Sequence, residues 1–100
     1  MNFYQINRLF LRLFGRLYGI CDISGFDFSP MEDKAIVLFV VRSERKKENF
    51  LNKSFHKCRD KYLTYIKKHP RYANFSYEFM TTSKEDVRKN FGGSYCNVMH

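Results

Sequence analysis

The sequence predicts an α+β fold, with a small three-stranded sheet, one long basic amphipathic helix and two further helices in the order α-β-β-α-β-α. Apolar residues recur at helical spacing over residues 2–20 and 42–71, residues 35–41 are continuously apolar, and residues 72–80 alternate. One hundred residues fit one domain, so residues 1–100 are expected to fold as a single unit. A hydrophobic content of 44% excludes a disordered basic tail.

Residues 2–20 have the pattern of an amphipathic helix. Helical spacing places six apolar residues on one face: Phe3, Ile6, Phe10, Leu13, Phe14 and Leu17. The opposite face carries Arg8, Arg12 and Arg16. We favour a helix packed on the core with a basic outer face, over an interfacial membrane helix or a mitochondrial-type presequence. The arginines interrupt every apolar run, so neither a signal peptide nor a bilayer-spanning helix is expected.

Two strands should follow. In residues 20–28, apolar side chains alternate with acidic ones, and Gly25 is a candidate for a β-bulge. A turn around Pro30 leads to residues 35–41, AIVLFVV, whose unbroken apolar and β-branched composition is typical of a central strand buried on both faces. These two segments supply the first two strands of the sheet.

Residues 42–71 read as one long amphipathic helix. Ser43 is a suitable N-cap, and His69-Pro70 should end the helix because the residue before proline is pushed out of the helical region. The expected buried stripe consists of Leu51, Phe55, Cys58, Tyr62 and Tyr65.

The C-terminal third supplies a strand and a short helix. Residues 72–80 alternate as a half-exposed strand, which would form a βαβ unit with residues 35–41 if the two run parallel. Ser83 and Asp86 form a capping box for a helix that extends to about Phe91 and ends at Gly92-Gly93. Residues 94–100 receive no assignment.

The long helix also carries the charge imbalance of the chain. Residues 42–71 hold eleven of the 18 basic residues and three of the ten acidic ones, a net charge of +8 that equals that of the whole chain. Lysines at i,i+4 steps, such as Lys53 and Lys57, repel one another, so local stability does not explain the pattern. The candidate residues for binding a polyanion or an acidic partner are Arg42, Arg45, Lys46, Lys53, Lys57, Lys67, Lys68 and Arg71, together with Arg8, Arg12 and Arg16.

Other chemistries find weak support. His56, Cys58, Cys96 and His100 could be drawn as a zinc set, but His56 and Cys58 are two positions apart on a helix and point apart, so no metal site is expected. The acidic turn at residues 32–34 has the letters E-x-K of some nucleases but follows a proline instead of lying within a strand. The element order partly overlaps that of type II KH domains, but residues 42–71 contain no glycine and therefore no GXXG loop.

The sequence thus predicts a non-enzymatic nucleic-acid-binding or nucleoprotein-binding module that acts through a basic helix face, without a cofactor. The alternative is a small phage-type inhibitor or adaptor that contacts a host protein, for example an acidic or nucleic-acid-bound one. Tyr72 and Tyr77 could stack on bases, although core packing is the more common fate of such side chains. Three cysteines without framework spacing indicate a reducing, cytoplasmic compartment. The choice between DNA and RNA and the oligomeric state stay open.

Overall fold

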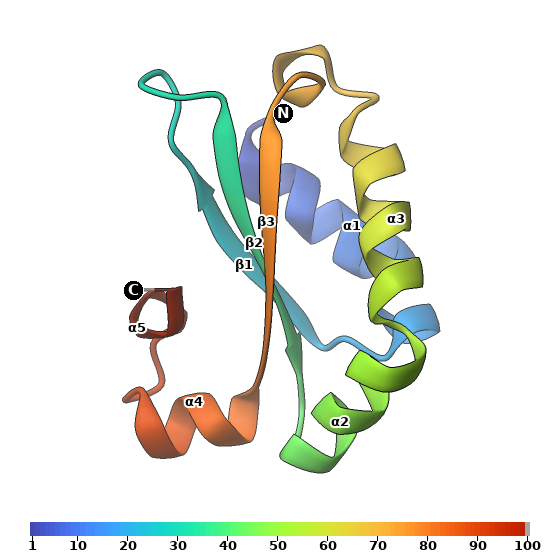
Figure 1. Cartoon of the computed structure of the whole chain (residues 1–100), viewed down its shortest axis with the longest axis vertical. Coiled ribbons are helices and arrows are strands. Elements are labelled where there is room, and N and C mark those ends of the chain that lie inside the picture. Colours follow the sequence, from blue (N-terminus) through green and yellow to red (C-terminus); the bar gives the residue numbers. More distant parts are fainter. Residues whose placement is uncertain (100) are drawn as a thin grey trace.

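The fold is built on a three-stranded mixed sheet, which Figure 1 shows with its flanking helices. The computed structural model describes residues 1–99. Strand β2 (Lys34–Val41) lies at the centre, paired antiparallel with β1 (Asp22–Asp27) and parallel with β3 (Ser76–Ser83). The predicted α+β class and the order α-β-β-α-β-α are confirmed, and the parallel pair completes the expected βαβ unit.

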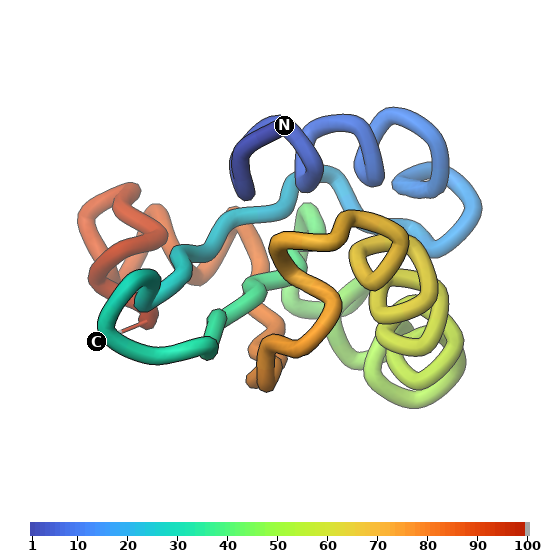
Figure 2. Tube along the Cα trace, turned by 90° about the horizontal axis from the view of Figure 1, so that it is seen from above, coloured from blue at the N-terminus to red at the C-terminus, as the bar shows by residue number. Residues whose placement is uncertain are grey.

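Helices cover both faces of this sheet. Helices α1 (Phe3–Tyr18), α2 (Glu44–Lys53) and α3 (Phe55–Ile66) lie on one side. The shorter helices α4 (Lys84–Asn90) and α5 (Tyr95–Met99) lie on the other side, as the view from above in Figure 2 shows. The three longer helices therefore present one broad outer surface, and α4 and α5 present another, separated from it by the sheet.

The core is aromatic and centres on β2, which is buried along Ala35–Val41 as its sequence predicted. Tyr62 packs edge-on against Phe10 and Phe39, with ring centroids 5.3 and 6.1 Å away, and so joins α1, β2 and α3. Its hydroxyl donates a 2.6 Å hydrogen bond to Oδ1 of Asn7, which is only 3% exposed. This buried polar pair fixes α3 against α1.

The prediction of one unbroken helix over residues 42–71 is wrong. The helix breaks at Ser54 into α2 and α3, and α3 ends at Ile66, ahead of a short 3-10 helix η1 (Pro70–Tyr72). The reason lies in the core: Phe50 and Tyr62 are both buried, yet on a continuous helix residues twelve apart point about 120° away from each other. The break turns both side chains inward.

The buried stripe also differs from the predicted one. Phe50 takes the place expected for Leu51, which is exposed. Ser43 does cap α2, accepting a 3.2 Å hydrogen bond from the Lys46 amide, and Ser83 caps α4 through the Asp86 amide at 3.0 Å. These two N-terminal signals were therefore right, whereas α3 ends at Ile66, ahead of the stop predicted at His69-Pro70.

Helix α1 is turned differently from the prediction. Leu13 and Leu17, expected in the core, are 57% and 71% exposed, whereas the polar Asn7 is buried. Leu17 borders a hollow between the last turn of α1 and α2, so no other element covers it, and Leu13 lies one turn earlier on the same side. The outer surface of α1 thus combines leucine with arginine.

The remaining boundaries shift modestly. No bulge occurs at Gly25, because β1 and β2 pair without interruption from Asp22↔Val40 to Asp27↔Ala35. Gly25 is needed for another reason: its φ is +154° and a Cβ there would lie 2.1 Å from the Ile36 carbonyl oxygen. Strand β3 begins at Ser76 instead of residue 72, because η1 places Tyr72 in the core. The unassigned tail contains α5.

Candidate nucleic-acid interface

Ten of the eleven predicted binding cations are exposed on the surface. Among residues 1–99 none of the ten forms an ion pair with a carboxylate, since the ion pairs present join other cations to Asp22, Glu44, Asp60 and Glu78. Their charge is therefore not neutralised within the described chain. The ten are Arg12, Arg16, Arg42, Arg45, Lys46, Lys53, Lys57, Lys67, Lys68 and Arg71.

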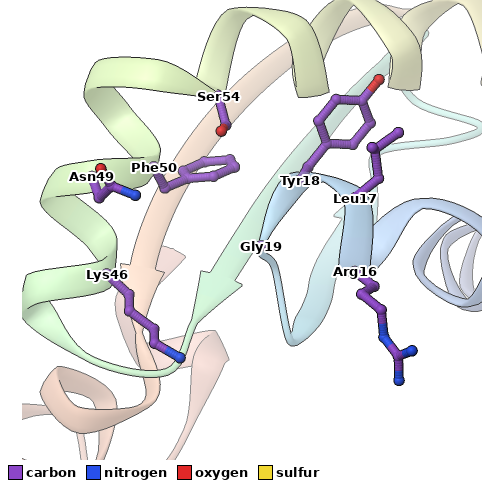
Figure 3. A pocket seen from close by; sticks show the side chains of 8 residues that line it. All are labelled: Arg16, Leu17, Tyr18, Gly19, Lys46, Asn49, Phe50 and Ser54. Atoms are coloured by element: carbon purple, nitrogen blue, oxygen red, sulfur yellow. The ribbon is translucent and has the colours of Figure 1, made fainter.

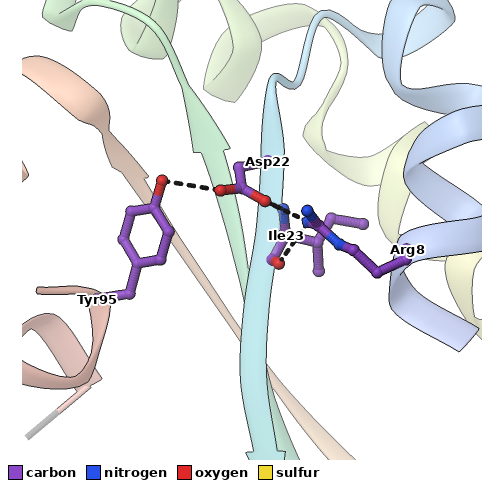
Figure 4. Close-up of polar contacts among 4 residues, drawn as sticks. All are labelled: Arg8, Asp22, Ile23 and Tyr95. Carbon is purple, nitrogen blue, oxygen red and sulfur yellow. Dashed lines mark hydrogen bonds and ion pairs between the residues drawn. The ribbon is translucent and has the colours of Figure 1, made fainter. Parts of the chain in front are cut away.

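Arg8 is the exception, because its guanidinium turns toward the sheet (Figure 4). Its Nη2 pairs with Oδ1 of Asp22 and donates a 3.1 Å hydrogen bond to the Ile23 carbonyl oxygen. The other Asp22 oxygen accepts a 2.9 Å hydrogen bond from the Tyr95 hydroxyl. This chain of contacts ties α1, β1 and α5 together, so Arg8 has a structural role and is not a free cation.

The other cations divide by position. Six exposed cations on α2, on α3 and on the segment that follows α3 are here called the basic face: Lys46, Lys53, Lys57, Lys67, Lys68 and Arg71. Phosphate contacts require only exposed cations along a surface, and the basic face supplies six of them. Arg45 stands apart, because it borders a shallow depression together with Glu44 and Glu48. Its surroundings are of mixed charge and less attractive to a polyanion.

The arginines of α1 and the cations of α2 meet at one place. Two adjoining hollows of about 350 and 340 Å³ lie where the last turn of α1 approaches α2, and both are lined by Arg16, Gly19 and Lys46. Figure 3 shows the first of them, with Lys46 directed into the space between the two helices. Arg42, at the end of β2, lines the second. We call the two together the α1–α2 hollow.

Among residues 1–99, no acidic residue lines the α1–α2 hollow. Besides the three cations its lining includes Tyr18, Asn49 and Phe50 on one side and Cys21 on the other. Burial raises the pKa of the Cys21 thiol, while the charges of Lys84 and Arg42 oppose that rise. Asn49 and Tyr18 were not singled out from the sequence, because nothing local marks them; only the approach of α1 to α2 brings them together.

The aromatic residues proposed to stack on bases are part of the core. Tyr72 is 1% exposed, and the half-buried Tyr77 donates a 2.8 Å hydrogen bond from its hydroxyl to the Tyr72 carbonyl oxygen. Two cations lie over aromatic rings at the edge of the core: Arg71 is 5.5 Å from the centre of the Tyr72 ring, and Lys61 is 5.0 Å from the centre of the Phe14 ring. Neither tyrosine is therefore available as a stacking platform.

The proposed metal ligands do not converge. Cys58 is buried, and burial raises its pKa to about 12, whereas His56 and Cys96 are exposed. In the part of the chain that the structure describes, no three His, Cys, Asp or Glu side chains gather into a group able to hold a metal ion. His100 lies outside the described residues. Within residues 1–99, no helix is both long and apolar enough to cross a bilayer.

No protein-family model, curated protein or solved structure matches this chain. The break at Ser54 does place two helices between the parallel strands β2 and β3, as in the type II KH order considered above. The junction between those helices, Lys53-Ser54-Phe55, has no glycine and cannot form the GXXG loop of that family.

Proposed function

We propose that this protein is a non-enzymatic nucleic-acid-binding module that acts in the cytoplasm and docks its basic face along phosphate groups. The observation that carries the proposal is the exposure of six cations over α2, α3 and η1, without an ion pair to any carboxylate of residues 1–99. A surface of this kind gains affinity for a nucleic acid because its cations displace the counterions condensed on the phosphates.

The mechanism is electrostatic, and the arrangement favours little sequence preference. Lysine ammonium groups on flexible stems contact phosphates as point charges and do not read base edges in a fixed geometry. Phe50 and Tyr62 are buried in the core and hold α2 and α3 against the sheet, so the helices that carry Lys46, Lys53 and Lys57 form a firm support. Affinity should therefore depend strongly on salt and weakly on sequence.

The test is a titration of fluorescently labelled single-stranded and duplex oligonucleotides at several salt concentrations. With about five phosphate contacts, the slope of log affinity against log salt should be near −4 to −5 on duplex DNA, and about −3.5 on a single strand. No binding of either nucleic acid at low salt would refute the proposal.

A protein partner is the second candidate, and one observation favours it. Leu13 and Leu17 are exposed beside Arg12 and Arg16 on the outer side of α1, where an acidic amphipathic segment of a host protein would find both apolar and charged contacts. An affinity capture from native lysate, with and without nuclease, separates the two functions. Partners lost on nuclease treatment support nucleic-acid binding, and a single retained protein of acidic surface supports the inhibitor or adaptor.

A further inference from the structure

The two parts of the α1–α2 hollow differ in chemistry although they share two cations. One part is lined by Arg16, Arg42 and Lys46 around the small residues Gly15 and Gly19. The other part has Tyr18, Asn49 and Phe50 beside the same Arg16 and Lys46. Both parts therefore carry cations; Arg42 adds a third to one part, and the other part adds aromatic carbon and a side-chain amide. A nucleotide has the same two chemistries next to each other, in its phosphate and its base.

We propose that the α1–α2 hollow binds one nucleotide of a single-stranded nucleic acid, with the phosphate between Arg16, Arg42 and Lys46 and the base against Tyr18. The inference rests on the proposed function and deepens it by naming the strand state and the subsite. Asn49, exposed on α2 at the border of the hollow, would meet the edge of the base with its amide.

Size and access agree with this ligand. Each part of the hollow measures about 340 to 350 Å³, at the lower end of the range found for small-ligand sites. Gly19, in the left-handed conformation with φ +77°, leaves open space where a side chain would stand. Phe50 also lines the hollow but is almost fully buried, so the half-buried Tyr18 is the ring that can offer a surface to a base.

The charge of the site must come from side chains. The last carbonyl groups of α1 carry partial negative charge and disfavour an anion, and the Gly15 carbonyl oxygen is already used by the amides of Gly19 and Ile20. The first turn of α2 has the opposite effect, because the amides at the start of a helix carry partial positive charge and favour an anion. Of the residues that the structure describes, three cations and no acid line the hollow, so its charge favours a phosphate.

A single strand is required because the bases of a duplex are stacked and paired, and none can enter a hollow without being flipped out. Duplex DNA can still lie along the basic face by its phosphates alone. The proposal therefore distinguishes two binding modes: a general one on α2 and α3, and a one-nucleotide subsite that operates only on unpaired strands.

The experiment compares wild type with Tyr18→Leu and Asn49→Leu, using a labelled oligothymidine and a duplex of the same length. Tyr18→Leu should weaken oligothymidine binding about 5- to 150-fold, the range for loss of one base–aromatic stack, and change duplex binding less than about twofold. Asn49→Leu should weaken oligothymidine binding with the same selectivity. Since Asn49 is exposed on a helix, this second variant keeps the test valid if loss of the Tyr18 ring disturbs folding.

The outcomes separate the subsite from the general function. If both variants, still folded by their thermal transitions, bind oligothymidine like wild type, the subsite is refuted while the basic face stands. If wild type binds neither nucleic acid, the proposed function fails. An NMR titration with thymidine monophosphate then tests nucleotide binding at the hollow independently of the basic face. Shifts of the Gly19 and Asn49 amides would support a nucleotide site, whereas shifts with inorganic phosphate equal to those with the nucleotide, or none at all, would overturn it.

Discussion

Replacing Lys53 and Lys57 by glutamate perturbs the centre of the basic face at little cost to the fold. Both side chains are exposed, and they lie on either side of the Ser54 break. Lys53 is in the last turn of α2, where an acidic replacement costs about 0.3–1 kcal/mol, and Lys57 is in the first turn of α3, where it contributes a similar gain. The glutamate that replaces Lys57 would also attract Lys61 one turn later, which adds about 0.2–0.5 kcal/mol. The free energy of unfolding should therefore change by less than about 1 kcal/mol.

Binding should respond much more strongly. Each phosphate contact contributes about 0.9 to the slope of log affinity against log salt on duplex DNA, so two lost contacts reduce the slope by about 1.8. If the variant and the wild type bind equally at 1 M salt, the variant should then bind roughly 60-fold more weakly than wild type at 0.1 M salt. Two added carboxylates increase this loss. Fluorescence anisotropy over a series of salt concentrations measures both quantities, and thermal denaturation measures the stability of the same samples.

The matched control is Arg88→Glu with Lys89→Glu, the same change of four charges placed on α4 across the sheet. Lys84 is unsuitable for the control, because its charge is felt by Cys21 in the α1–α2 hollow. Both control residues are in the last turn of α4, so this variant loses some stability and is compared well below its melting temperature. Equal loss of binding in the two double variants would show that only net charge matters and would refute the assignment of the basic face.

Three further outcomes concern the core. Tyr62→Phe leaves Oδ1 of Asn7 without its hydrogen bond and should cost about 1–3 kcal/mol in chemical denaturation, while adding Asn7→Leu should recover part of that loss; no cost would contradict the buried pair. Ellman's reagent should modify the exposed Cys96 at once and the buried Cys58 only on global unfolding, and equal rates would contradict the packing of α3. Burial raises the pKa of Cys58 from 9.0 to about 12 and also raises the pKa of Tyr62, so the stability from these protonated groups is complete below pH 9 and lost as pH rises through about 9 to 12. The melting temperature should fall over that window, and a constant value would contradict this account.

The fold was largely predictable because its signals are local. The apolar run that became β2 and the serine caps of α2 and α4 were recognised from neighbouring residues alone. The break at Ser54 was not, because Phe50 and Leu51 are adjacent apolar residues and either could begin a buried stripe. Which of the two is buried depends on where the sheet lies under α2, and this position cannot be predicted from the helical spacing of apolar residues.

The candidate site shows the same division. Exposed cations on α2 and α3 follow from composition and spacing, but their relation to α1 does not. Arg8 and Arg16 are equivalent in the sequence pattern, yet one pairs with Asp22 in β1 and the other borders the α1–α2 hollow. Lys46 is far from Arg16 along the chain, so the hollow exists only through tertiary packing. The buried Asn7 could have been noticed, since its spacing places it between Phe3 and Phe10 on the apolar face.

The most direct measurement is an NMR titration of the labelled protein with a short single-stranded oligonucleotide at low salt. The amides of Lys53, Lys57 and Lys67 on the basic face should shift on binding, together with those of Gly19 and Asn49 at the α1–α2 hollow. Amides in the last turn of α4, at Arg88 and Lys89, should stay in place, because this turn lies across the sheet. Shifts confined to α4 and α5, or no shifts at millimolar oligonucleotide, would contradict the account of a nucleic-acid-binding face on α2 and α3.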